Sequence, residues 1–182
     1  MMESVALDEP IRDTIRRDLM AMGKKFEYVC SPKSWSEEGG VLRQWDLWGP
    51  LILCLILSVS SWLKAEKSEK RAVFSFLYVF YWLGSWVVVA NVSLLGGKIS
   101  TFQALGVLGY CSFPLVIACV VALLVPQVLS LLKVFIVAAG VYMSTKAAVT
   151  YVKSTIPEDK FYIATYPLLL FFIIIAWITV VL

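Results

Sequence analysis

Polar and charged residues dominate the first 45 positions of the chain, and long apolar blocks fill the rest. The change occurs across Trp45-Asp46-Leu47-Trp48-Gly49-Pro50. A helix of about 20 apolar residues crosses the hydrocarbon core of a bilayer with all its backbone groups bonded internally. The apolar blocks therefore predict five membrane-spanning helices, at about residues 46–63, 72–95, 104–125, 131–152 and 161–182.

The length of the apolar segments decides two of these boundaries. The apolar run over residues 102–152 would be roughly 76 Å long as a single helix, so it must cross twice. Pro126 and Gln127 mark the expected turn, and a re-entrant hairpin is the alternative. The first block is short, but a helix that begins at Asp46 would reach roughly 27 Å, with Asp46 as its N-cap.

The expected fold is therefore all-α. It is a polytopic membrane protein in which residues 46–182 form a bundle of five transmembrane helices and residues 1–45 form a separate N-terminal tail. Composition agrees, because 60% hydrophobic residues, 16% charged residues and a mean hydropathy of +0.81 exclude an ordinary water-soluble domain. The sequence shows no signal peptide and no lipidation motif, so the tail is expected to be retained in the cytosol.

The side of the membrane with more Lys and Arg near the span ends is expected to be cytosolic, and here the two sides have to be compared. Four cations in the first loop, within residues 64–71, oppose a cytosolic tail. Seven cations in the tail, together with Lys98, Lys153 and Lys160 in the loops on the same side, favour one. We therefore expect a cytosolic N-terminus and, after five crossings, a lumenal C-terminus.

One part of the tail is periodic. Apolar residues recur there at spacings of three and four, which predicts an amphipathic helix over about residues 9–28, followed by a linker over residues 29–45. The apolar face consists of Ile11, Ile15, Leu19, Met22 and Phe26. This helix is expected either to pack on the membrane domain or lie on the lipid surface, or to bind a partner protein.

The sequence offers little to catalysis. It contains no histidine, and the spans contain no paired acidic residues, so we expect no catalytic, metal or cofactor site and no enzyme activity. Lys146 is the charge expected well inside a span. Tyr142, Lys146 and Thr150 form a polar stripe on the fourth helix, which either faces other spans or lipid headgroups as a functional site, or lets Lys146 reach the membrane surface.

The third span should be kinked. Pro114 cannot donate a backbone hydrogen bond, and its ring collides with the carbonyl of Tyr110 one turn earlier. Ser112 is placed to satisfy a freed carbonyl group, and Gly109 allows a neighbouring helix to approach. On the fourth span Gly140, Ser144 and Ala148 form a row of small residues that also permits close packing.

Two of these segments together resemble the paired signature of the Yip domain family. They are Asp46-Leu47-Trp48-Gly49-Pro50 before the first span and Gly109-Tyr110-Cys111-Ser112-Phe113-Pro114 in the third. The resemblance extends from about residue 12 onward and is strongest to the subgroup of the sixth animal Yip-domain member, through segments such as Gly23-Lys24-Lys25-Phe26 and Leu94-Leu95-Gly96-Gly97. The family motif maps onto Asp46, Leu47, Gly49, Pro50, Gly109, Tyr110 and Pro114.

This resemblance implies a five-span protein of the Golgi and endoplasmic reticulum. It further implies a non-enzymatic role in vesicle-mediated protein transport between these compartments, with Rab (Ypt) GTPases and other Yip or Yif proteins as partners. Homo- or hetero-oligomers are possible in such a role, and contact with membrane lipid is implied while contact with nucleic acid is not. The alternative is a small transporter, or a lipid-handling or membrane-shaping protein, in which Pro114 and the Lys146 stripe would line a cavity.

Overall fold

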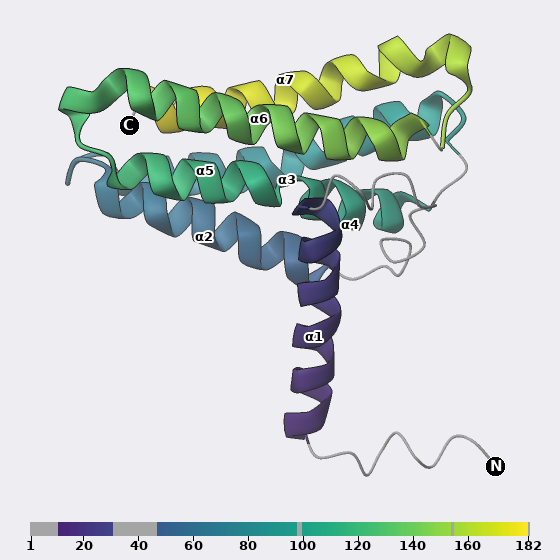
Figure 1. Cartoon of the computed structure of the whole chain (residues 1–182), viewed down its shortest axis with the longest axis horizontal. Coiled ribbons are helices and arrows are strands. Elements are labelled where there is room, and N and C mark those ends of the chain that lie inside the picture. Colours follow the sequence, from purple (N-terminus) through teal and green to yellow (C-terminus); the bar gives the residue numbers. More distant parts are fainter. Residues whose placement is uncertain (1–10, 31–46, 98–99, 154, 182) are drawn as a thin grey trace.

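A computed structural model describes residues 11–30, 47–97, 100–153 and 155–181. The regular structure of these residues is helical throughout (Figure 1). The main helices are α1 (Ile11–Cys30), α2 (Trp48–Lys64), α3 (Lys70–Leu94), α4 (Thr101–Cys111), α5 (Phe113–Leu124), α6 (Ser130–Lys153) and α7 (Phe161–Val181). Two short 3-10 turns, η2 (Gln127–Leu129) and η3 (Glu158–Lys160), precede α6 and α7.

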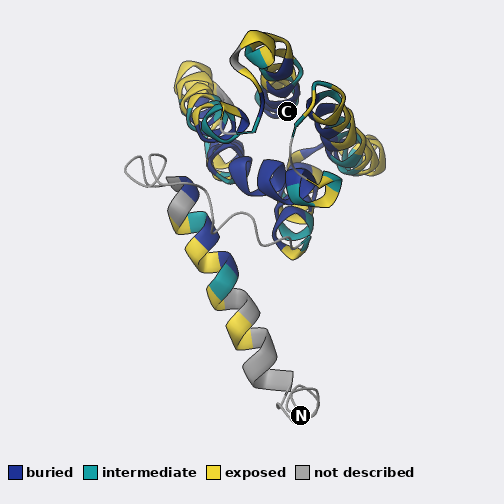
Figure 2. Cartoon of the chain, turned by 90° about the vertical axis from the view of Figure 1, so that its right-hand side faces the viewer, coloured by how far each residue is buried: buried dark blue, intermediate teal, exposed yellow. Residues whose placement is uncertain are grey.

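The helices α2 to α7 lie side by side along the long axis of the molecule, with α4 and α5 end to end as one bent helix (Figure 1). The helix α1 runs across this axis and projects away from the bundle in both views (Figures 1 and 2). Among the described residues, four helical segments are long and apolar enough to cross a membrane: α3, the combined α4 and α5, α6 and α7. The helix α2 is apolar but shorter, with 17 residues.

The bent helix α4–α5 forms the centre of the bundle. In its most apolar stretch 72% of the residues are buried, against 28% in α3, 33% in α6 and 39% in α7. Figure 2 shows the buried colour gathered on the inner faces of the bundle, with exposed residues outside. Many of the exposed residues are large and apolar, among them Leu55, Phe76 and Phe135. An apolar exterior on this scale is typical of a surface that faces lipid.

Helix ends follow the local signals in the sequence. Gly96 adopts a φ of 90° after α3, and the amide of Gly97 donates to the carbonyl of Val92 at 3.1 Å, so these two glycines end the helix. The helix α4 begins with a reciprocal cap, in which Ser100 Oγ accepts from the amide of Gln103 at 3.3 Å and the side chain of Gln103 accepts from the amide of Ser100.

Two expectations about boundaries have different outcomes. The run over residues 102–152 folds back at Pro126 into two antiparallel helical segments, as expected. The expected helix start at Asp46 is wrong: α2 begins at Trp48, and its N-cap position is Leu47, which makes no side-chain cap. The first helical hydrogen bond runs from the amide of Leu51 to the carbonyl of Leu47, because Pro50 has no amide hydrogen to donate. Asp46 itself lies outside the described residues.

Candidate functional site

The two halves of the sequence motif pack directly against each other. Gly49 at the start of α2 faces the ring of Tyr110 in α4, and a Cβ atom on Gly49 would lie 2.5 Å from Tyr110 Oη. One residue further, Pro50 covers Gly109, where a Cβ atom would lie 3.0 Å from the Cα atom of Pro50 and closer still to its ring. Each half therefore supplies one glycine and one ring, so that α2 and α4 interlock at backbone distance.

The bend between α4 and α5 is held by hydroxyl groups. Ser112 separates the two helices, and Pro114 follows within the first turn of α5, as expected for a kink at this proline. Ser112 Oγ donates to the carbonyl of Gly109 at 2.6 Å. Since this uses the only proton on Ser112 Oγ, the hydroxyl of Tyr81 in α3 is the donor in its 2.7 Å hydrogen bond to the same oxygen.

A second hydroxyl group, that of Ser144 in α6, accepts a hydrogen bond on the other side of the bend. The amide of Leu115 donates to Ser144 Oγ of α6 at 3.0 Å. The row of small residues on α6 permits this approach, because a Cβ atom on Gly140 would lie 2.5 Å from Ala118 Cβ and 3.3 Å from the carbonyl oxygen of Pro114. The close packing expected from this row is therefore present, and it places a hydrogen-bond acceptor at the kink.

Removing the hydroxyl of Ser144 should destabilise the bend. We expect Ser144→Ala to cost about 1–2 kcal/mol, because the buried amide of Leu115 loses its partner. Reversible unfolding in mixed detergent micelles measures this. Ser60→Ala is the matched control, since Ser60 Oγ donates only to the carbonyl of Leu57 in its own helix. Equal losses in the two variants would contradict the role of Ser144.

The C-terminal end of α1 docks on the same motif. The ring of Phe26 lies between Phe113, with ring centres 4.3 Å apart, and Tyr110, at 5.2 Å. The ammonium group of Lys25 lies 5.0 Å from the centre of the Tyr110 ring, and the Lys25 side chain is only 3% exposed. Met22 and Val29 are also buried. The apolar face expected on the tail helix thus packs on the bundle through Met22 and Phe26, while the side chains of Ile11, Ile15 and Leu19 lie outside the described residues.

The polar stripe on α6 lies elsewhere. Lys146 and Tyr142 are exposed on the outside of the bundle, and Lys146 Nζ lies 5.4 Å from the centre of the Tyr142 ring. Thr150 Oγ1 donates to the carbonyl of Lys146 at 3.0 Å. The structure therefore brings Tyr142, Lys146 and Thr150 together, but places them away from the motif and outside the bundle interior.

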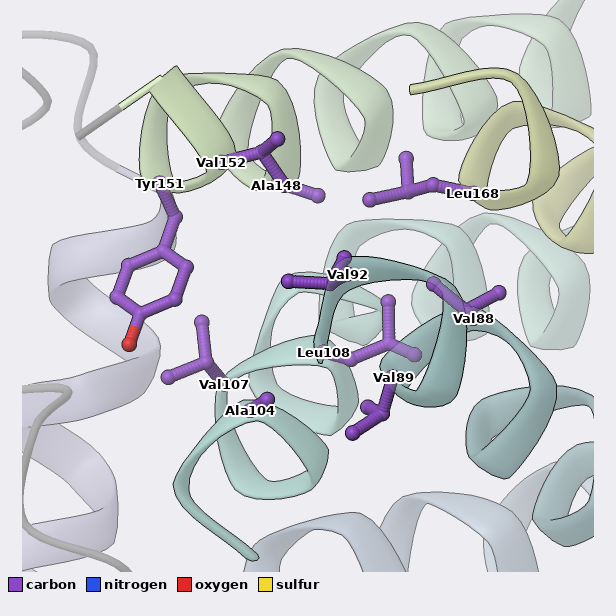
Figure 3. A pocket seen from close by; sticks show the side chains of 10 residues that line it. All are labelled: Val88, Val89, Val92, Ala104, Val107, Leu108, Ala148, Tyr151, Val152 and Leu168. Carbon is purple, nitrogen blue, oxygen red and sulfur yellow. The ribbon is translucent and has the colours of Figure 1, made fainter. Parts of the chain in front are cut away.

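An apolar cavity lies between the ends of four helices, near α1 (Figure 3). It has a volume of only about 30 Å³ and lies between α3, α4, α6 and α7. Tyr151 is the one lining residue with a polar side-chain atom. Neither Pro114 nor Lys146 lines it. The lining residues are Val88, Val89, Val92, Ala104, Val107, Leu108, Ala148, Tyr151, Val152 and Leu168.

Two residues of the structure, Tyr81 and Lys133, are not singled out by the sequence pattern. Tyr81 reaches the motif from a distant helix, and its only signal is a hydroxyl-bearing side chain inside an apolar span. Lys25 belongs to a segment that carries the family resemblance, but its contact with Tyr110 is not expected from the sequence. Lys133, near the start of α6, is 6% exposed and donates from Nζ to the carbonyl of Val180 at 3.3 Å. It thereby satisfies one of the free carbonyl groups at the end of α7.

Known proteins resemble this chain over nearly all its length. The Yip1 domain pattern matches residues 34–178. The protein named "Protein YIPF6 homolog" from Dictyostelium discoideum is 41% identical over 96% of this chain and 94% of its own length. "Protein YIPF6" from Homo sapiens is 38% identical over 96% of this chain and 76% of its own length, and "Protein YIP4" from Schizosaccharomyces pombe is 39% identical over 95% and 74%. No solved structure matches the chain. The chain is therefore an integral membrane protein that belongs to the Yip1 domain family, within its YIPF6 subgroup.

Proposed function

We propose that the protein is a non-enzymatic adaptor of vesicle-mediated transport between the endoplasmic reticulum and the Golgi. In this role it crosses the membrane five times, and its cytosolic tail helix engages Rab GTPases while the bundle associates with other Yip or Yif proteins. The observation that carries the proposal is the attachment of α1 to the motif through Phe26. A helix fixed at one end to a membrane domain presents its other faces at a defined position.

The exposed side of α1 has the chemistry of a docking surface. Arg16, Met20 and Lys24 follow one another at intervals of four residues, so they share one face of the helix, and all three are exposed. Met20 is apolar and 52% exposed between two cations. A basic face with an exposed methionine suits an acidic partner surface that also has an apolar patch. We refer to these three residues as the outer face of α1.

Five crossings require α2 to span the bilayer. Its 17 residues are roughly 26 Å long, close to the thickness of a hydrocarbon core. Tryptophans lie at each end, with Trp48 in the first turn and Trp62 near the last, and both are exposed. Tryptophan is enriched at membrane–water interfaces, which supports a spanning position for this helix.

Five crossings place the two termini on opposite sides. The cations of the tail and of the loops at its end of the bundle favour a cytosolic N-terminus, against the four cations between α2 and α3. The C-terminus is then lumenal. The outer face of α1 consequently lies on the side where Rab GTPases reside.

Reversing charge on the outer face tests the adaptor role. We expect Arg16→Glu combined with Lys24→Glu to lower capture of GTP-loaded, prenylated Rab GTPases by the purified full-length protein roughly tenfold or more, since like charges oppose an acidic partner. Capture by a panel of purified Rab proteins in detergent is the measurement. Lys67→Glu is the control, because Lys67 lies in the loop at the opposite end of the bundle. Equal capture by all variants, or no capture by any, would refute the role of this face.

A further inference from the structure

An open groove lies between α2 and α3, near the loop that joins them and far from the motif. It is lined by Val59, Trp62, Arg71, Phe74 and Ser75 and has a volume of about 390 Å³. This lies within the range of small-molecule sites in proteins, which occupy roughly 300–1,000 Å³. Three of the five lining side chains are apolar or aromatic, so the groove suits a hydrocarbon occupant.

The rim of the groove is positively charged. Lys64, Lys67, Lys70 and Arg71 lie in or beside the loop, against two acidic residues, Glu66 and Glu69. Lys70 Nζ lies 4.8 Å from the centre of the Trp62 ring, which places that cation over the groove wall. Arg71 is exposed and is itself a lining residue. In the part of the chain that the structure describes, its guanidinium group has no hydrogen bond or ion pair.

The surroundings of the groove identify the class of occupant. Its apolar wall continues into the exposed outer faces of α2 and α3, where Leu55, Ile56 and Val79 are also exposed. Acyl chains cover such faces when the two helices lie in a bilayer. Trp62 marks the level of the membrane interface, where lipid phosphates lie. A guanidinium group at that level offers a planar pair of donors that matches the oxygens of a phosphate.

We propose that this groove binds one glycerophospholipid, with an acyl chain along Val59 and Phe74 and the phosphate on Arg71. The lipid fills the groove between α2 and α3 beside their loop. Lys70 stays on the Trp62 ring and adds to the positive potential around the phosphate. The binding requires α2 and α3 to lie in the membrane but does not depend on any protein partner.

Photocrosslinking distinguishes this site from general contact with lipid. The full-length protein is reconstituted in phosphatidylcholine vesicles that contain a phosphatidylcholine with a photoreactive acyl chain, and labelled peptides are mapped by mass spectrometry. In a parallel sample the probe is a diacylglycerol with the same chains and no phosphate. We expect phosphatidylcholine to label the groove at least fivefold more than diacylglycerol. Equal labelling by the two probes would overturn the proposal.

Two substitutions locate the contacts. Arg71→Gln should lower labelling of the groove by phosphatidylcholine to the level seen with diacylglycerol, because the phosphate loses a charge-assisted contact. Lys67→Gln is the matched control: it removes the same charge from the loop next to Arg71, but Lys67 does not line the groove. It should leave labelling unchanged. If both variants lose labelling equally, general attraction of headgroups explains the result and the site is refuted.

A third substitution tests the chain-binding wall. Val59→Trp fills the groove from an exposed position, so we expect it to lower labelling by phosphatidylcholine several-fold while thermal stability in detergent stays close to that of the parent protein. Undiminished labelling would contradict the assignment of the acyl chain. These readouts are independent of Rab capture by α1, so failure of the lipid site and failure of the adaptor role are separate results.

Discussion

Gly49→Ala and Gly109→Ala are each expected to destabilise the protein by about 1–3 kcal/mol, although alanine is a better helix former than glycine. The added methyl groups would enter the space occupied by the ring of Tyr110 and by Pro50, respectively. Thermal unfolding in detergent measures the loss. Gly23→Ala is the matched control, because no atom lies within 4 Å of a Cβ at that position in α1. That variant should keep or raise stability.

A double-mutant cycle assigns the effect to the interlock. Tyr110→Ala removes the ring that a methyl group on Gly49 would strike. The combined variant should therefore lose less stability than the sum of the two single variants, with a coupling of about 0.5–3 kcal/mol. Strict additivity would show that Gly49 and Tyr110 do not act as one unit. If Gly49→Ala kept the stability of the parent protein, as Gly23→Ala should, the close packing of α2 on α4 would be contradicted.

Phe26→Ala is expected to release the end of α1 from the bundle. The substitution removes both ring contacts of Phe26, with Tyr110 and with Phe113, and weakens the enclosure of Lys25. Aromatic pairs contribute roughly 0.5–1.5 kcal/mol each beyond the area that they bury, so protection of the amides of residues 22–29 should fall roughly tenfold or more. Hydrogen exchange followed by mass spectrometry on the full-length protein measures this protection.

The same helix provides the control for this experiment. Met20→Ala changes a side chain of α1 that is exposed on the outer face and distant from the motif. In the Met20→Ala variant, the protection of the amides of residues 22–29 should match that in the parent protein. If Phe26→Ala also leaves protection unchanged, α1 is not held by its aromatic contacts, and the fixed placement on which the adaptor proposal rests would be lost.

The positions of the helices could be predicted from the sequence because their causes are local. Apolar blocks determine where helices can lie in lipid, Gly96 ends α3 through its positive φ, and Pro114 bends the third apolar segment through its missing amide hydrogen. The start of α2 lies two residues beyond the predicted one. Hydropathy shows where the chain becomes apolar, whereas the first hydrogen bond of the helix is that of Leu51, because Pro50 has no amide hydrogen to donate.

The candidate site could be predicted only in part. The residues of the motif were identifiable, but their pairing was not, because Gly49 and Tyr110 are far apart in the sequence and no periodicity relates them. The same holds for Tyr81 with Ser112 and for Lys133 with Val180. Such contacts arise from how the helices are arranged around α4 and α5. The outer position of Lys146 likewise follows from which face of α6 the small residues Gly140 and Ser144 occupy.

If α2 spans the membrane as proposed above, its length has a consequence for the kind of membrane that suits the protein. At 17 residues, roughly 26 Å, it matches a bilayer of the endoplasmic reticulum, about 27 Å thick, better than a plasma membrane of about 32 Å. In the thicker membrane each ångström of mismatch costs a fraction of a kcal/mol. Because α2 packs closely on α4 at Gly49, it cannot tilt independently to relieve this mismatch. The protein would then be less stable in the thicker membrane of the cell surface.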